Sequence, residues 1–266
     1  MGNLDYKQFS RRHRPHIHPP GATLFLTYRL AGSIPKATVR EYKAKKEWLE
    51  NQITQATKSA QNGNSEQVKR DKLKLVEQFE RFKRQWFLRF EDVLHKAETG
   101  PMWMQDERVA DAVAENLHKL DGDAYRLDAY TVMSNHVHAL FQPNLSEKEL
   151  RETFDETGHL AFIGEHPGLA RIMHALKGRS ARECNLIIRR TGNFWEHESF
   201  DHVVRAGRFN RTLRYILNNP VKAGLVDDWR KWRWNYCRKD LVDLMFDKLQ
   251  FVANGARVRS AKATTN

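Results

Sequence analysis

Cysteine and long apolar runs are nearly absent from this chain, and both absences narrow its class. Only two of its 266 residues are cysteines, Cys184 and Cys237, and they lie far apart. This excludes a disulfide framework and a cysteine zinc site, and it favours a reducing compartment. No stretch of about 18 uncharged apolar residues occurs, and the N-terminus has no apolar signal-like core. We therefore expect a cytoplasmic protein with no membrane partner.

Acidic residues are scarce in the C-terminal third. The net charge is +12, and residues 171–239 hold sixteen Lys and Arg against six Asp and Glu. Residues 101–170 show the reverse, with five basic residues against thirteen acidic ones. Positive charge concentrated in one segment is typical of a protein that binds a polyanion, most often nucleic acid. A soluble basic protein without such a partner remains the alternative.

Residues 37–96 differ in composition from the rest, being rich in Glu, Lys, Arg, Gln and Ala. The sequence QNGNS interrupts them, which predicts two helices, one ending near Ala60 and one from about Glu66 to His95. Apolar residues recur in the second helix at steps of three to four, at Leu73, Val76, Phe79, Phe82, Trp86 and Phe90. We expect a helical hairpin inserted into a larger domain.

The remaining segments alternate between strand and helix patterns. Strands are predicted in ATLFLTYRL, in YRLDAYTVM and in the segment that follows a turn at Ser134 and Asn135, and a short strand or a loop is predicted in NFWEHESFDHVV. Helices are predicted at 106–120, at 167–190 and in FNRTLRYILNN, which must end near Pro220. The order predicts an α+β fold, an antiparallel sheet with helices on one face in a ferredoxin-like arrangement.

The expected domain limits follow from these segments. A catalytic domain would comprise residues 1–36 and 97–238, the hairpin would be 37–96, and 239–266 would form a C-terminal helix and a flexible tail. At this length one large domain or two small ones can form a core.

His136 and His138 lie two residues apart in the β-prone run TVMSNHVHALFQ. Residues at i and i+2 of a strand share one face, so the two imidazoles would lie side by side, as two ligands of one divalent ion must. Two ordinary histidines would give the same pattern. A second His-x-His, at His16 and His18, lies between prolines and is expected in a flexible loop.

A further group of potential ligands occupies one short stretch. It consists of Glu196, His197, Glu198, Asp201 and His202. A second metal site is one interpretation, and packing with acids at the surface is the other.

Tyr215 and Asn219 are four residues apart and would lie on one face of a helix. A tyrosine can attack phosphorus, and an amide oxygen can bind a hard cation. Spacing alone fits an ordinary aromatic residue of an amphipathic helix equally well.

Longer motifs carry a resemblance to a known family. NHVHAL resembles the His-hydrophobic-His motif of HUH endonucleases, and FWEHESFDHVVR and RYILNNPVKAGLV look like those of REP-associated tyrosine transposases. The similarity runs from ATLFLTYRL to about Asn235, apart from residues 37–96.

This resemblance implies a chemistry. Tyr215 would attack a DNA phosphate, forming a 5′-phosphotyrosyl link and leaving a 3′-hydroxyl. His136, His138 and Asn219 would bind Mg²⁺ or Mn²⁺, and the substrate would be hairpin-forming, REP-like single-stranded DNA. The enzyme would be a transposase or endonuclease. Apart from residues 37–96, the sequence shows no obligate dimer surface, and we expect a monomer or weak dimer.

Basic side chains in two regions are the candidate DNA contacts. They are Arg11, Arg12, Arg14, Lys177, Arg179, Arg182, Arg189 and Arg190. A solvated helix face is the alternative for those beyond residue 170. Two other functions stay open: a hairpin nucleic-acid binder that does not cleave, and a metalloenzyme that hydrolyses small phosphoesters.

Overall fold

The structure is a computed structural model that describes residues 23–62, 66–97, 100–144, 167–204 and 207–242. The N-terminal arginines, His16, His18 and the expected C-terminal helix beyond residue 242 lie outside these ranges. No described helix combines the length and the apolar character needed to cross a bilayer.

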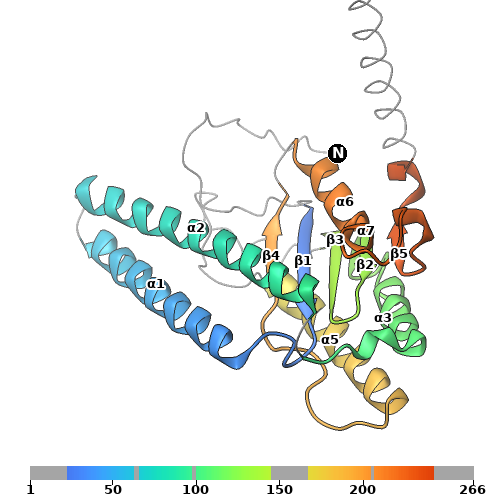
Figure 1. The fold of residues 1–266 in the computed structure, drawn as a ribbon. Helices are drawn as coiled ribbons and strands as arrows, with labels where there is room; N and C mark the ends of the chain where they lie inside the picture. Colours follow the sequence, from blue (N-terminus) through green and yellow to red (C-terminus); the bar gives the residue numbers. More distant parts are fainter. Residues whose placement is uncertain (1–22, 63–65, 98–99, 145–166, 205–206, 243–266) are drawn as a thin grey trace, which may run out of the picture.

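Five antiparallel strands form one open sheet in the order β4-β1-β3-β2-β5 (Figure 1). The strands are β1 (Leu24–Arg29), β2 (Tyr125–Val132), β3 (His136–Pro143), β4 (Phe200–Val203) and β5 (Asn235–Cys237). The first four give the ferredoxin-like order, and this confirms the predicted fold class. The short edge strand β5 was not expected from the sequence.

Two helices cover one face of the sheet, α3 (Glu107–Lys119) and α5 (Pro167–Ile187). Leu26 and Tyr28 of β1 point to this face and pack with α3 and α5 in the main core. Asp106 caps α3 by accepting a hydrogen bond from the backbone N–H of Arg108, as acids at a helix start favour.

The opposite face is also covered. Helix α6 (Phe209–Leu217) and the four-residue α7 (Asn219–Lys222) follow β4, and Leu213 and Ile216 of α6 pack on Phe25 and Leu140. The alternation of strand side chains therefore fills both faces with apolar residues. The 3₁₀ turns η1 (Trp103–Gln105) and η2 (Trp229–Lys231) complete the connections.

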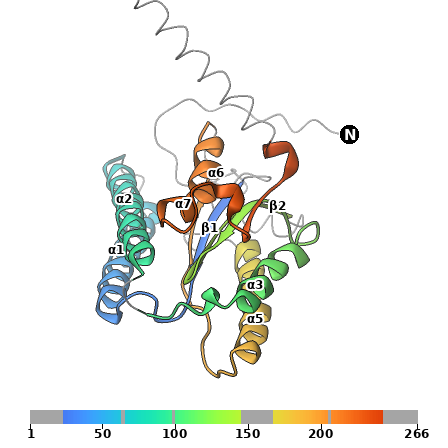
Figure 2. The same cartoon turned by 45° about the vertical axis from the view of Figure 1, so that its right-hand side comes forward.

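The segment between β1 and η1 forms the two long helices predicted, α1 (Lys36–Asn62) and α2 (Glu66–Lys96). They pack on one another through a small core of their own, made by Leu49, Ile53, Phe79, Phe82 and Trp86. Figure 2 shows this pair on one side of the sheet and α3 with α5 on the other. The C-terminal end of α2 reaches the sheet face that carries α6, where Phe87 packs edge-on against Phe25 of β1.

Two glycines lie at the base of the hairpin, where its two ends pass close to each other. Gly32 follows β1 with φ +82°, and Gly100 follows α2 with φ +90°. A Cβ on Gly100 would come within 2.6 Å of the carbonyl oxygen of Gly32. Only glycine fits this close backbone approach, so the chain leaves and re-enters the sheet domain at a single narrow point.

Candidate metal and nucleophile site

His136 and His138 leave β3 on the same face, as the spacing predicts. Their Nε2 atoms are 3.1 Å apart, and the ring of His138 lies 5.5 Å from that of Tyr215. This face of the strand is not exposed to solvent, because both imidazoles are fully buried. The cover comes from α2 and α6, two elements that the local strand pattern cannot reveal.

Asn135 fixes the tautomer of His136. The side-chain N–H of Asn135 donates to the carbonyl of Leu94 at 3.1 Å, so its Oδ1 faces the ring and accepts from His136 Nδ1 at 2.7 Å. With the proton on Nδ1, the lone pair of Nε2 points into the site. His138 is held in a similar way, with Nδ1 2.7 Å from Thr27 Oγ1. Such outer contacts orient histidines that bind metals.

Helix α2 brings two further potential metal ligands to the site, Glu91 and His95, which were not predicted from the sequence. They stand four residues apart, so both face the sheet from one side of the helix. Ligand atoms of Glu91, His95 and His136 all lie within 4.8 Å of one another, the one such group of His, Cys, Asp and Glu found among the described residues. Their sequence signal was weak, because they end a helix full of charged residues.

Tyr215 lies at the same site. Its hydroxyl donates to the carboxylate of Glu91. The side-chain N–H of Asn219 donates to the backbone carbonyl of Tyr215 at 3.0 Å, and its Oδ1 meets Nε2 of His95. Although α6 ends at Leu217 and Asn219 begins α7, the one-turn relation between Tyr215 and Asn219 is retained. Lys222 places its ammonium 4.5 Å from the centre of the Tyr215 ring.

The charges of the group suit a cation. Burial acts to raise the pKa of Glu91, but His138, His136 and the hydrogen bond from Tyr215 together outweigh it, and the pKa falls to about 2. Burial also lowers the pKa of His136 well below its ordinary value. The pKa of Tyr215 is raised by burial and by Glu91. At neutral pH the site therefore holds a carboxylate, a neutral His136 and a protonated tyrosine.

These donors fit a divalent ion. Nε2 of His138 is 3.1 Å from its His136 counterpart and 3.2 Å from Oε2 of Glu91. Neighbouring ligands of an octahedral ion with bonds of about 2.1 Å are about 3 Å apart. The predicted ligand Asn219 is at the site as well, in contact with His95.

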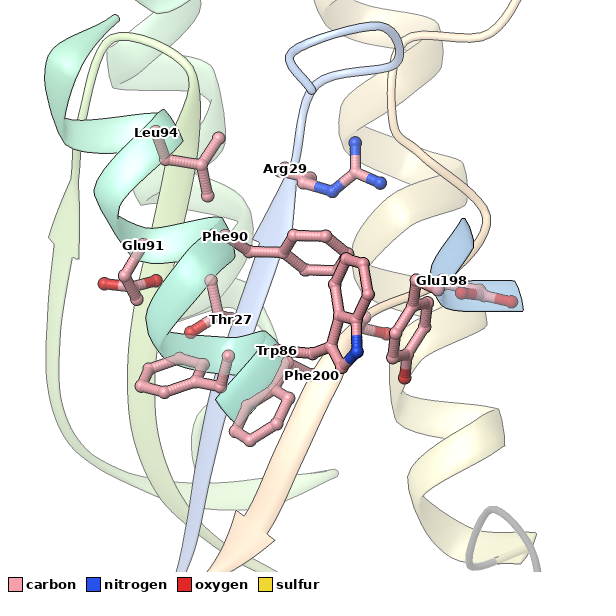
Figure 3. A pocket seen from close by; sticks show the side chains of 11 residues that line it. Thr27, Arg29, Trp86, Phe90, Glu91, Leu94, Glu198 and Phe200 are labelled. Carbon is pink, nitrogen blue, oxygen red and sulfur yellow. The ribbon is translucent and has the colours of Figure 1, made fainter. Parts of the chain in front are cut away.

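A small aromatic cavity of about 30 Å³ adjoins the group between β1, α2 and the segment before β4. Figure 3 shows Phe90 and Trp86 leaving α2 on one side and the Glu91 carboxylate on the other. Arg29 lies in the wall, paired with Glu196 at 3.4 Å. The cavity has room for water-sized molecules.

The acidic stretch before β4 does not form a second cluster of ligands among the residues described. Glu196 pairs with Arg29 and Glu198 lies 3.9 Å from Lys43. Packing, rather than a second metal site, is the interpretation that these contacts favour.

The predicted DNA contacts on and after α5 lie on the sheet face opposite the histidine pair. Arg179, Arg182 and Arg189 are exposed. The ammonium of Lys177 instead donates to the carbonyls of Glu196 and His197 and thereby ties α5 to the segment before β4. Arg190 stacks 3.9 Å from the ring centre of Trp103 and donates to the Asn193 carbonyl. Lys177 and Arg190 therefore make contacts within the protein that do not depend on DNA binding.

No family model and no curated protein matches the chain. A solved structure that it resembles is that of a REP-associated tyrosine transposase bound to a REP hairpin. The chains share 14% sequence identity at a TM-score of 0.39, over 85% of this chain and 82% of that one.

Proposed function

We propose that this protein is a metal-dependent endonuclease and strand transferase for hairpin-forming single-stranded DNA, with Tyr215 as nucleophile. The observation that carries the proposal is the meeting of three groups in one buried site: the Tyr215 hydroxyl, the paired Nε2 atoms of His136 and His138, and the carboxylate of Glu91. A tyrosine placed beside a set of cation ligands is suited to attack on a phosphodiester.

A divalent ion, when bound at this site, would supply positive charge beside the scissile phosphate. His136, His138 and Asn219 would hold the ion, and the hydrogen bond to Glu91 orients the Tyr215 hydroxyl. The tyrosine oxygen forms a bond to phosphorus while the bond from phosphorus to the 3′ oxygen breaks. The proton lost by the hydroxyl is balanced by the one that the 3′ oxygen gains. The resulting phosphotyrosine preserves the energy of the broken phosphodiester bond for strand transfer.

The domain limits belong to this proposal. Residues 1–36 and 97–238 would make the catalytic domain, with 37–96 inserted into it and 239–266 appended. The basic third of the chain would bind the DNA backbone, while Arg11, Arg12 and Arg14 would reach bases at the foot of the hairpin.

The test is cleavage of labelled hairpin single-stranded DNA with Mn²⁺, read on a denaturing gel. EDTA should abolish cleavage, and so should the joint change His136→Gln and His138→Gln, which keeps buried volume better than alanine would. His174→Gln, on the exposed side of α5, is the matched control and should cleave normally. Undiminished cleavage in EDTA would refute the metal role.

A further inference from the structure

The inserted hairpin does more than extend from the domain, because the last turns of α2 lie over the histidine pair. Glu91 is 5% exposed, and one of its carboxylate oxygens is 3.2 Å from Nε2 of His138. One helical turn further on, His95 lies with its ring centre 5.8 Å from that of His136. Both residues come from the hairpin, and the two histidines come from the sheet.

The second oxygen of Glu91 marks a position for a ligand. Oε1 is buried and has no hydrogen-bond partner among the residues that the structure describes. A buried ionised oxygen without a partner is costly, and such atoms are rare in folded proteins. A cation bound between Glu91 and the imidazoles would supply the missing partner.

The kinds of donor indicate the kind of cation. The imidazole nitrogens of His95 and His136 and the carboxylate of Glu91 lie within 4.8 Å of one another. Nε2 of His138 adjoins two of these three residues, at 3.1 Å from His136 and 3.2 Å from Glu91. Mg²⁺ prefers oxygen ligands and retains water, whereas imidazole favours first-row transition metals. We propose that Glu91 and His95 are metal ligands supplied by the hairpin, completing with His136 and His138 a site that prefers a transition-metal dication to Mg²⁺.

This inference rests on the same site as the proposed function, but it is tested without DNA. The metal-free full-length protein is titrated with MnCl₂, CoCl₂ and MgCl₂ by calorimetry, and the absorption spectrum of bound Co²⁺ reports the ligand set. The variants are Glu91→Gln, which keeps the side-chain volume, and His95→Gln. Matched controls are Asp92→Asn, an exposed carboxylate on the same helix that pairs with Lys96, and the exposed His174→Gln.

The wild type should bind one ion, with Mn²⁺ and Co²⁺ bound more tightly than Mg²⁺. Loss of an outer contact to a metal ligand weakens affinity about 10- to 100-fold, so loss of a ligand itself should cost about 100-fold or more. Each hairpin variant should show that loss together with a changed Co²⁺ spectrum, and both controls should match the wild type. Thermal unfolding of the metal-free variants verifies that each is folded.

Three results would overturn the inference: no saturable binding by the wild type, Mg²⁺ bound as tightly as Co²⁺, or hairpin variants that bind within about threefold of the wild type. Its failure can be told apart from that of the proposed function. If hairpin variants bind metal normally while the wild type still forms a DNA adduct, only the ligand assignment fails. If metal binding follows the expected pattern and no adduct forms, only the nuclease proposal fails.

Discussion

At the scale of single residues, Asn135 decides which nitrogen of His136 faces the site. The side-chain N–H of Asn135 donates to the Leu94 carbonyl of α2, and the side-chain oxygen of Asn135 keeps the ring proton of His136 on Nδ1. The amide therefore joins three parts of the molecule: the turn before β3, the first histidine and the end of the hairpin. Asn135 is 1% exposed, so solvent does not compete for these bonds.

Replacement of Asn135 by alanine should weaken Mn²⁺ binding by about 10- to 100-fold, because the His136 ring loses the partner that fixes its orientation. Calorimetry measures the loss. Asn144→Ala removes an amide that bonds the backbone carbonyls of Gly122 and Asp123 away from the site, and it should leave affinity unchanged. Equal affinities for the two variants would show that Asn135 does not position His136.

The histidine pair was predictable and the acid beside it was not, for a physical reason. Which face a strand side chain takes depends only on its own position, so His136 and His138 could be paired from two residues of spacing. Glu91 reaches them across 47 residues of chain, through the packing of α2 against the sheet. Nothing within α2 distinguishes Glu91 from the other acids of a charged helix. The burial of the pair escaped prediction for the same reason.

At the scale of elements, the helical hairpin was predictable because its two helices carry their own start, break and apolar stripe. Leu49, Phe79 and Phe82 form a core that needs no contact from the sheet. The position of the hairpin is set elsewhere, at its base, where Gly32 and Gly100 pass each other. The backbone contact at Gly32 and Gly100 therefore determines the position of Glu91 and His95 relative to the sheet.

Gly100→Ala should destabilise the protein more than Gly122→Ala does. Both glycines have a left-handed φ, +90° and +86°, so alanine costs about 1–2 kcal/mol in either place. Around Gly122 nothing lies within 4 Å of a new Cβ, whereas at Gly100 it would collide with the carbonyl oxygen of Gly32. Urea unfolding measures the loss of unfolding free energy in each variant, and the difference between the two losses is the cost of the collision. Identical losses of unfolding free energy would mean that the base of the hairpin is not tightly packed.

At the scale of the whole molecule, the exposed arginines of α5 and the candidate site lie on different faces of the sheet. Helix α5 with its exposed arginines is on one side of the sheet, and the candidate site is on the other, together with the exposed Arg211 and Arg214 of α6. A DNA strand in contact with both the α5 arginines and the candidate site would have to pass around an edge of the sheet. The charge bias of residues 171–239 was evident from the sequence, but its division between the two faces of the sheet was not, because it depends on which face each helix covers.

Changing Arg179 and Arg182 to Glu should lower the affinity for all single-stranded sequences alike and flatten the salt dependence. Each phosphate neutralised contributes a slope of about −0.7 on a log–log plot. Binding of a labelled hairpin at several salt concentrations measures the slope. The same charge reversal at Arg70 and Lys74, exposed on α2, is the control and should change it less. If the α5 variant keeps the wild-type slope, that helix presents only a solvated face.

The most direct test of the central claim is to identify the residue that becomes attached to DNA. The wild type is incubated with labelled hairpin single-stranded DNA and Mn²⁺, and the covalent adduct is digested and sequenced by mass spectrometry. We predict a 5′-phosphate on Tyr215, and no adduct with Tyr215→Phe, which should still bind the hairpin with nearly unchanged affinity because only the attacking hydroxyl is lost. An adduct on another tyrosine such as Tyr130, or cleavage by Tyr215→Phe, would contradict the account. Binding without any adduct would instead identify a hairpin-binding protein that does not cleave.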